Sequence, residues 1–172
     1  MKTITKVLAL TLAAMLLLCG CAAKPESFTA NGMSIVLTDD FEKSAQEGFE
    51  VVYASKNAAV LVLTEAYGTG LDAALLSAKD YAELFMAVSG KGDVEVKTDK
   101  TDAGADMAYC TYTSVVDGAS YTYLATVHKN ATAFWVIQFS APTADYEKQA
   151  ADFTAYAKSV TFDSPYVVSV TP

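Results

Sequence analysis

A cysteine and a histidine are the residues of this sequence best suited to nucleophilic chemistry. Cys110 is the only cysteine beyond residue 21, and His128 is the only histidine of the 172-residue chain. A thiol beside an imidazole can act as a nucleophile with its own base. The Asp117-Gly118 segment between them is typical of a two-residue hairpin turn.

That turn decides whether the thiol and the imidazole can meet. A two-residue turn at Asp117-Gly118 pairs Cys110 with Ala125 and His128 with Met107. Because side chains alternate along a strand, Cys110 and His128 then point to opposite faces of the sheet. Unless a bulge intervenes, the spacing therefore excludes a catalytic dyad, and it predicts that Cys110 is a small buried residue.

Carboxylates are the remaining candidates for chemistry. Asp99, Asp102 and Asp106 could offer oxygens to calcium, but their spacing does not match a calcium-binding loop with a closing Glu. We interpret them as a solvated loop. Without a second histidine or a partner cysteine, a transition-metal site is not expected. The sequence predicts no metal and no cofactor, and an acidic hydrolase using residues such as Glu65 or Asp106 remains the alternative.

The two faces of the same hairpin differ in composition. The face of Cys110 also carries Tyr112, Tyr121 and Tyr123, which we expect to pack in the core. The other face is rich in hydroxyl side chains and is predicted to be an open surface or one lightly covered by a helix, and we expect a partner to bind there. Its members are Thr111, Thr113, Ser120, Thr122 and Thr126.

The elements that must position these residues follow from hydrophobic periodicity. Strands are predicted at 28–30 and 33–37 around Asn31-Gly32, at 49–55 and 58–66, and at 93–98 as a polar edge. Three longer strands are predicted at 105–116, 119–128 and 132–140, with a final strand at 160–162. Amphipathic helices are predicted at 71–88 and 144–158. This order favours an α+β domain, an antiparallel β-sheet with packed helices.

The N-terminus has the pattern of a secretion signal. Lys2 and Lys6 precede an uncharged run over residues 7–18, too short to remain as a transmembrane helix. The segment Leu18-Cys19-Gly20-Cys21 resembles the bacterial lipobox, which implies cleavage after residue 20 and a diacylglycerol on Cys21. Cys19 is the weaker candidate for acylation, because Leu18 would then precede the cleavage site, where the lipobox has a small residue.

Processing at that site predicts an anchored protein. Residues 1–20 would be the cleaved signal peptide and residues 21–27 a lipidated N-terminus and tether. The acyl chains on Cys21 would hold the protein on the extracytoplasmic side of the cell membrane. The alternative interpretation, a buried N-terminal helix, would leave an apolar cylinder without an amphipathic face.

Charge narrows the class of partner. The chain has a formal net charge of −8 and no arginine, so it lacks the basic stripe that nucleic acid requires. Removing residues 1–20 removes two lysines and no acidic residue. The mature domain is therefore more acidic still, and membrane contact is expected from its acyl chains and not from its surface.

Two segments carry a resemblance to a known family. The run from Phe28 through Gly32-Met33-Ser34-Ile35 to Phe41 and the closing segment Phe153 to Phe162 are similar to PsbP-like and DcrB-like domains. The resemblance covers residues 28–163 and leaves 164–172 as a C-terminal tail. It implies a PsbP-like α/β/α sandwich, a fold of photosystem accessory proteins, a Ran-binding nuclear import factor and bacterial envelope lipoproteins.

That resemblance supplies no catalytic motif to carry over to this chain. We therefore expect a membrane-anchored extracytoplasmic lipoprotein that acts as a non-catalytic binding or accessory module for a protein or another envelope component. The alternative is the small cell-envelope hydrolase that uses acidic residues.

Overall fold

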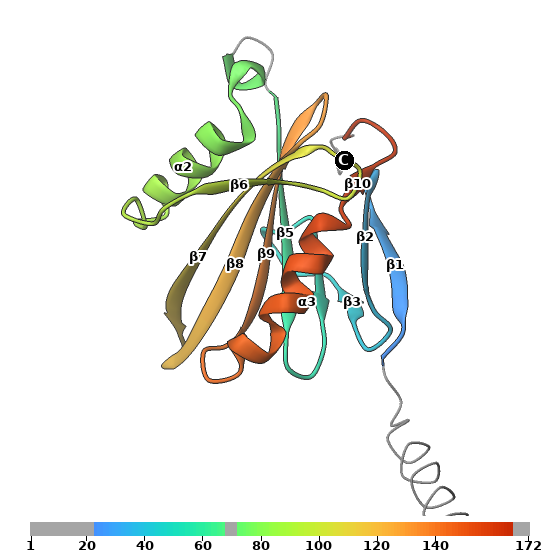
Figure 1. Cartoon of the computed structure of the whole chain (residues 1–172), viewed down its shortest axis with the longest axis vertical. Coiled ribbons are helices and arrows are strands. Elements are labelled where there is room, and N and C mark those ends of the chain that lie inside the picture. Colours follow the sequence, from blue (N-terminus) through green and yellow to red (C-terminus); the bar gives the residue numbers. More distant parts are fainter. Residues whose placement is uncertain (1–22, 68–71, 167–172) are drawn as a thin grey trace, which may run out of the picture.

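A computed structural model describes residues 23–67 and 72–166 of the chain (Figure 1). The predicted signal peptide, Cys21 and the end of the predicted tail lie outside the described residues. Within the described residues, no helix is long and apolar enough to cross a membrane.

The centre of the domain is a seven-stranded antiparallel sheet, as counted over the described residues. In spatial order its strands are β3 (Glu42–Ser44), β4 (Val51–Ala54), β5 (Ala59–Ala66), β9 (Ala133–Pro142), β8 (Ala119–Lys129), β7 (Asp106–Val116) and β6 (Lys97–Lys100). The turn between β7 and β8 has positive φ at both Asp117 (50°) and Gly118 (80°), as a type I′ turn requires. The predicted register is confirmed, because Cys110 lies opposite Ala125 and Met107 opposite His128.

A second sheet, with three strands in the part of the chain that the structure describes, lies beside the first. It contains β1 (Pro25–Ala30), β2 (Met33–Thr38) and β10 (Thr161–Phe162), with β2 in the middle. The sequence predicted these strands but not their separation into a sheet of their own. It also missed β3, whose three residues are all exposed and so show no hydrophobic alternation.

The first helical segment differs from the prediction for residues 71–88. A 3₁₀ turn, η1 (Asp72–Leu75), precedes helix α2 (Ala78–Val88), because Ser77 caps the helix. The Ser77 Oγ accepts from the Asp80 N–H at 3.1 Å, and the Asp80 Oδ2 accepts from the Ser77 N–H at 3.0 Å. Leu84 and Val88 continue the apolar period of the predicted helix, but both are exposed.

The two helices cover opposite faces of the large sheet, which confirms the α/β/α sandwich (Figure 1). Helix α3 (Tyr146–Lys158) and the small sheet enclose the larger core, which includes fully buried Trp135, Phe139 and Phe153. Helix α2 encloses the smaller core, built on Phe134 and Cys110. Burial of large apolar side chains on both faces is the main source of stability.

The two ends of the described chain are held against the domain. Strand β1 begins at Pro25, inside the segment assigned to a tether, and Lys24 exchanges two hydrogen bonds with Asp39. The Asp39 N–H donates to the Lys24 carbonyl at 2.8 Å, and the Lys24 N–H donates to the Asp39 Oδ1 at 2.9 Å. At the other end, Tyr166 packs edge-on against Trp135 with ring centroids 5.5 Å apart.

Candidate functional site

Cys110 and His128 lie on opposite faces of the sheet, as predicted. Cys110 is buried beside α2, and this burial raises the pKa of its thiol. His128 is 1% exposed on the α3 side, and burial lowers its pKa to about 3. Neither group is placed to act as a nucleophile or as its base.

Helix α3 covers part of the hydroxyl-rich face, which is the second of the two predicted arrangements. Thr126 is fully buried and Thr122 is 8% exposed, whereas Thr111, Thr113 and Ser120 are exposed. The same face carries Met107 and Leu124, whose burial requires the cover that α3 supplies. The sequence left both arrangements open because alternation shows which residues share a face but not what covers it.

A hydrogen-bond network compensates for the burial of the Thr126 hydroxyl. The Thr126 Oγ1 donates to the Ile137 carbonyl at 3.2 Å and lies 3.1 Å from the His128 Nε2. A hydroxyl has one proton, so Thr126 must accept from His128, whose Nε2 therefore carries the ring proton. Both buried polar groups are satisfied.

The tyrosines of the other face pack as half-buried residues. Tyr112 and Tyr123 stack with ring centroids 5.0 Å apart, and the Tyr112 hydroxyl donates to the Gln138 Oε1 at 3.3 Å. Tyr121 is also half-buried. Of the three, Tyr112 packs against the smaller core on the α2 side of the sheet and Tyr123 stacks on Tyr112, so the predicted core packing is only partial.

The acidic residues do not form a catalytic pair. Glu65 accepts a hydrogen bond from the Tyr81 hydroxyl, and Asp106 pairs with Lys100. Strands β9 and β8 lie between β5 and β7, so the backbones of Glu65 and Asp106 are about 14 Å apart across the sheet. The two carboxylates bind different partners, Tyr81 of α2 and Lys100 of the edge strand β6. Among the described residues, no group of three metal-ligating side chains comes together.

A hollow of about 360 Å³ lies between α3 and the hydroxyl-rich face; we call it the α3 groove. Its buried floor consists of Met107, Leu124, Thr126 and Ala157. Its exposed rim consists of Asp99, Thr111, Glu147 and Thr154. An apolar floor with a few polar rim groups is typical of ligand sites, and this volume is at the small end of their range.

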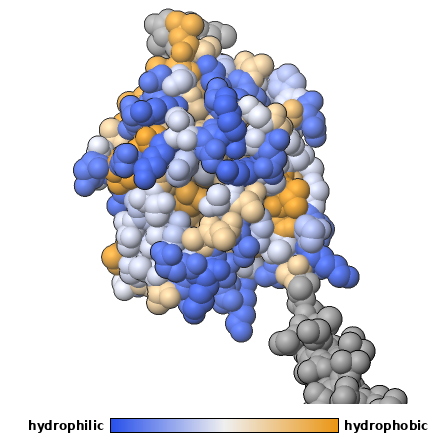
Figure 2. Space-filling model, in the orientation of Figure 1, coloured by the Kyte–Doolittle hydropathy of each residue, from blue (hydrophilic) through white to orange (hydrophobic). Residues whose placement is uncertain are grey.

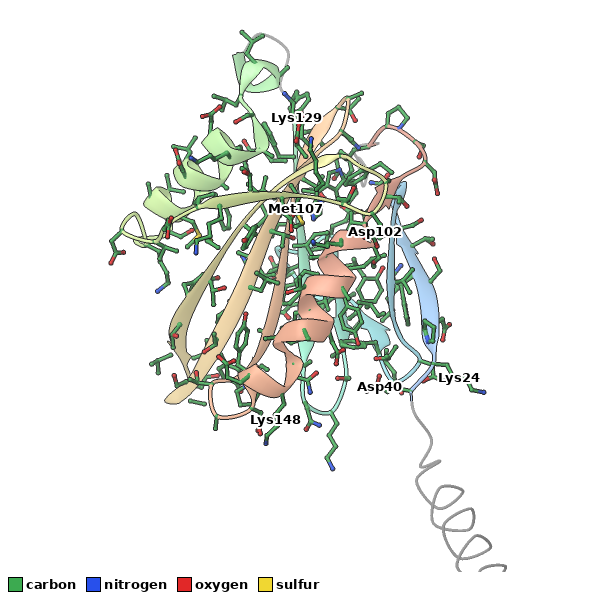
Figure 3. The ribbon with its side chains drawn as sticks, in the orientation of Figure 1. Lys24, Asp40, Asp102, Met107, Lys129 and Lys148 are labelled. Atoms are coloured by element: carbon green, nitrogen blue, oxygen red, sulfur yellow. The ribbon has the colours of Figure 1, made fainter. Side chains whose placement is uncertain are left out.

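The charged groups of this groove are placed at its ends. The Asp99 Oδ2 lies 2.7 Å from the Lys158 Nζ, and this hydrogen bond holds the pKa of Asp99 below its usual value. Glu147 belongs to no salt bridge in the described part of the chain. Figure 3 shows Asp102 near one end of α3 and Lys148 at the other end.

A larger hollow of about 780 Å³, the α2 cleft, lies where η1 and the start of α2 approach the ends of β7 and β8. Its principal cation, Lys129, already has partners. The Lys129 Nζ donates to the carbonyls of Ala74 and Leu76 at 2.7 Å each, and it lies 5.7 Å from the centre of the Phe134 ring. Lys129 therefore ties η1 to the sheet, a role the sequence did not indicate.

Comparison with solved structures gives the class of fold. The chain is similar to cyanobacterial PsbP from Synechocystis, with a TM-score of 0.63, 15% identity and coverage of 83% of this chain and 95% of that one. It is also similar to the Ran-binding protein Mog1p of Saccharomyces cerevisiae, with a TM-score of 0.53, 10% identity and coverage of 83% and 97%.

A third solved structure, from Bacteroides thetaiotaomicron, has a TM-score of 0.55 at 11% identity, and the match covers 81% of this chain and 48% of that one. No family model and no curated protein matches the sequence. At these identities the likeness defines a PsbP-like fold, and the function must be argued from the site.

Proposed function

We propose that this protein is a membrane-anchored extracytoplasmic lipoprotein whose domain binds a partner and catalyses no reaction. The lipobox-like segment ending at Cys21 supports the anchor. The fold supports the binding role, since one protein that shares it is a Ran-binding protein. The separation of Glu65 from Asp106 and the burial of Cys110 argue against a hydrolase.

The observation that best supports this proposal is the small number of residues between Cys21 and the folded domain. Lys24 is already clamped to Asp39, so an acylated Cys21 would be only three residues from the domain, a reach of about 10 Å. Figure 3 shows Lys24 and Asp40 at one end of the domain and Lys129 at the other end. Acylation would turn the Lys24 end toward the bilayer and the α2 cleft away from it.

Metabolic labelling with an alkyne analogue of palmitate tests the anchor. The wild-type chain should incorporate the label, and Cys21→Ala should abolish both incorporation and cleavage after residue 20. Cys19→Ala is the matched control, since it removes a neighbouring thiol and should leave labelling unchanged. A wild-type chain without label would refute the anchor, and label that survives Cys21→Ala would place it elsewhere.

Proximity labelling in the native cell tests the binding role. A labelling enzyme fused after Pro172 should enrich a reproducible partner from the cell envelope. Enrichment should persist in a His128→Gln variant, because the imidazole is buried. Substrate turnover by the purified protein that is lost in Glu65→Gln would refute the non-catalytic interpretation.

A further inference from the structure

The α3 groove is elongated and has an apolar middle. Its lining residues on α3 begin at Tyr146 and Glu147, continue through Ala150 and Thr154, and end at Ala157. At 1.5 Å per residue they extend over about 16 Å of helix. In Figure 2 this face shows hydrophilic residues above and below a paler, more apolar central zone.

Both ends of the groove keep negative charge. At the C-terminal end of α3, Lys158 pairs with Asp99, while the Asp102 N–H donates to the Lys158 carbonyl at 2.8 Å and keeps a second carboxylate nearby. Two acids against one lysine leave that end negative. At the other end, Glu147 has no salt bridge within the described part of the chain, because the Lys148 Nζ lies 2.6 Å from the Asp145 Oδ1.

This charge distribution selects the kind of ligand. An anion would meet carboxylates at both ends, and the lysine at one end is already paired. A molecule that fits must carry positive charges near its two ends and an apolar chain between them. The exposed hydroxyls of Thr111 and Thr154 lie along the rim, where they can accept hydrogen bonds from a cation in the middle of such a chain.

We propose that the α3 groove binds a linear aliphatic polyamine. Its methylene segments lie on Leu124, Ala150 and Ala157, and its terminal ammonium groups lie at Glu147 and beside Asp99. The inference rests on the binding part of the proposed function and is independent of acylation at Cys21. It assigns a ligand class to the hydroxyl-rich face of the sheet.

Spermidine is the probe, and the test is isothermal titration calorimetry of the full chain in neutral detergent micelles at about 0.15 M salt, where surface charges are screened. Glu147→Gln should weaken binding about tenfold by removing one charge-assisted hydrogen bond. Glu83→Gln on α2 is the matched control, with the same charge change on an exposed helix face, and should change affinity less than twofold.

A variant that fills the groove tests the binding site without changing its charge. Thr154→Leu places a larger side chain at the rim on an exposed helical position, so folding should be preserved and binding should fall at least tenfold. A thermal melt of each variant verifies folding. Hexylamine, which carries one ammonium group, should bind at least tenfold more weakly than spermidine.

Three results would overturn the proposal. They are the absence of spermidine binding, equal losses in Glu147→Gln and Glu83→Gln, and an unchanged affinity in folded Thr154→Leu. If spermidine does not bind and the protein still enriches an envelope partner, the polyamine site is refuted and the proposed binding module stands. If spermidine binds and no envelope partner is enriched, the envelope partner is refuted and the polyamine site stands.

Discussion

The buried imidazole of His128 should make stability depend on pH. The side chain is 1% exposed, its Nε2 donates to Thr126, and burial lowers its pKa from 6.5 to about 3. Because the folded-state pKa lies below the unfolded-state value, protons bind the unfolded chain preferentially between these two pH values. Stability is therefore fully present above pH 6.5 and decreases as the pH falls toward 3.

The magnitude follows from the size of this shift. Each pH unit below 6.5 costs about 1.4 kcal/mol, so His128 should lower the free energy of unfolding by about 2 kcal/mol at pH 5. The loss should approach about 5 kcal/mol near pH 3. In His128→Gln this contribution disappears, while the amide can still donate a hydrogen bond to Thr126.

Urea unfolding at pH 7 and pH 5 measures the effect in both proteins. The wild-type protein should lose about 2 kcal/mol more than His128→Gln between the two pH values. Carboxyl groups whose pKa is lowered, such as those of Asp80 and Asp99, titrate in both proteins and cancel in the comparison. Parallel pH profiles, or an imidazole that titrates near pH 6.5 in the folded protein, would refute the reasoning.

Other substitutions test the two cores. Cys110→Ser should destabilise the fold by about 1–3 kcal/mol in urea unfolding, and the native thiol should react slowly with a bulky thiol reagent; rapid reaction would show exposure. Thr126→Asp should prevent folding as judged by circular dichroism, whereas Thr113→Asp on the exposed part of the same face should fold; equal tolerance would contradict the α3 cover. Phe153→Ala should cost about 3–5 kcal/mol and Leu84→Ala less than about 1 kcal/mol in thermal or urea unfolding, and similar costs would contradict the assigned core. Elemental analysis of the purified protein should find no stoichiometric metal, and a bound metal would contradict the interpretation of the acidic loop as solvated.

Local patterns alone determined much of the fold of this protein. The Asn31-Gly32 and Asp117-Gly118 turns need positive φ at both positions, and those residue types accept it, so each hairpin has a defined register. That register was enough to place Cys110 and His128 on opposite faces. The sequence also predicted the long strands and the helix α3 within a few residues, because their hydrophobic periods extend over many positions.

Only the tertiary structure decided what covers each face of the sheet. Thr126 donates to the Ile137 carbonyl of β9 and lines the α3 groove beneath α3, and these elements are close in space because of the topology and not because of any local pattern. Leu84 fits an apolar helix face but remains exposed, since the angle at which α2 meets the sheet depends on both surfaces. The α3 groove arises in the same way. Its floor and rim come from β6, β7, β8 and α3, and a hollow between packed elements depends on how all their side chains fit together.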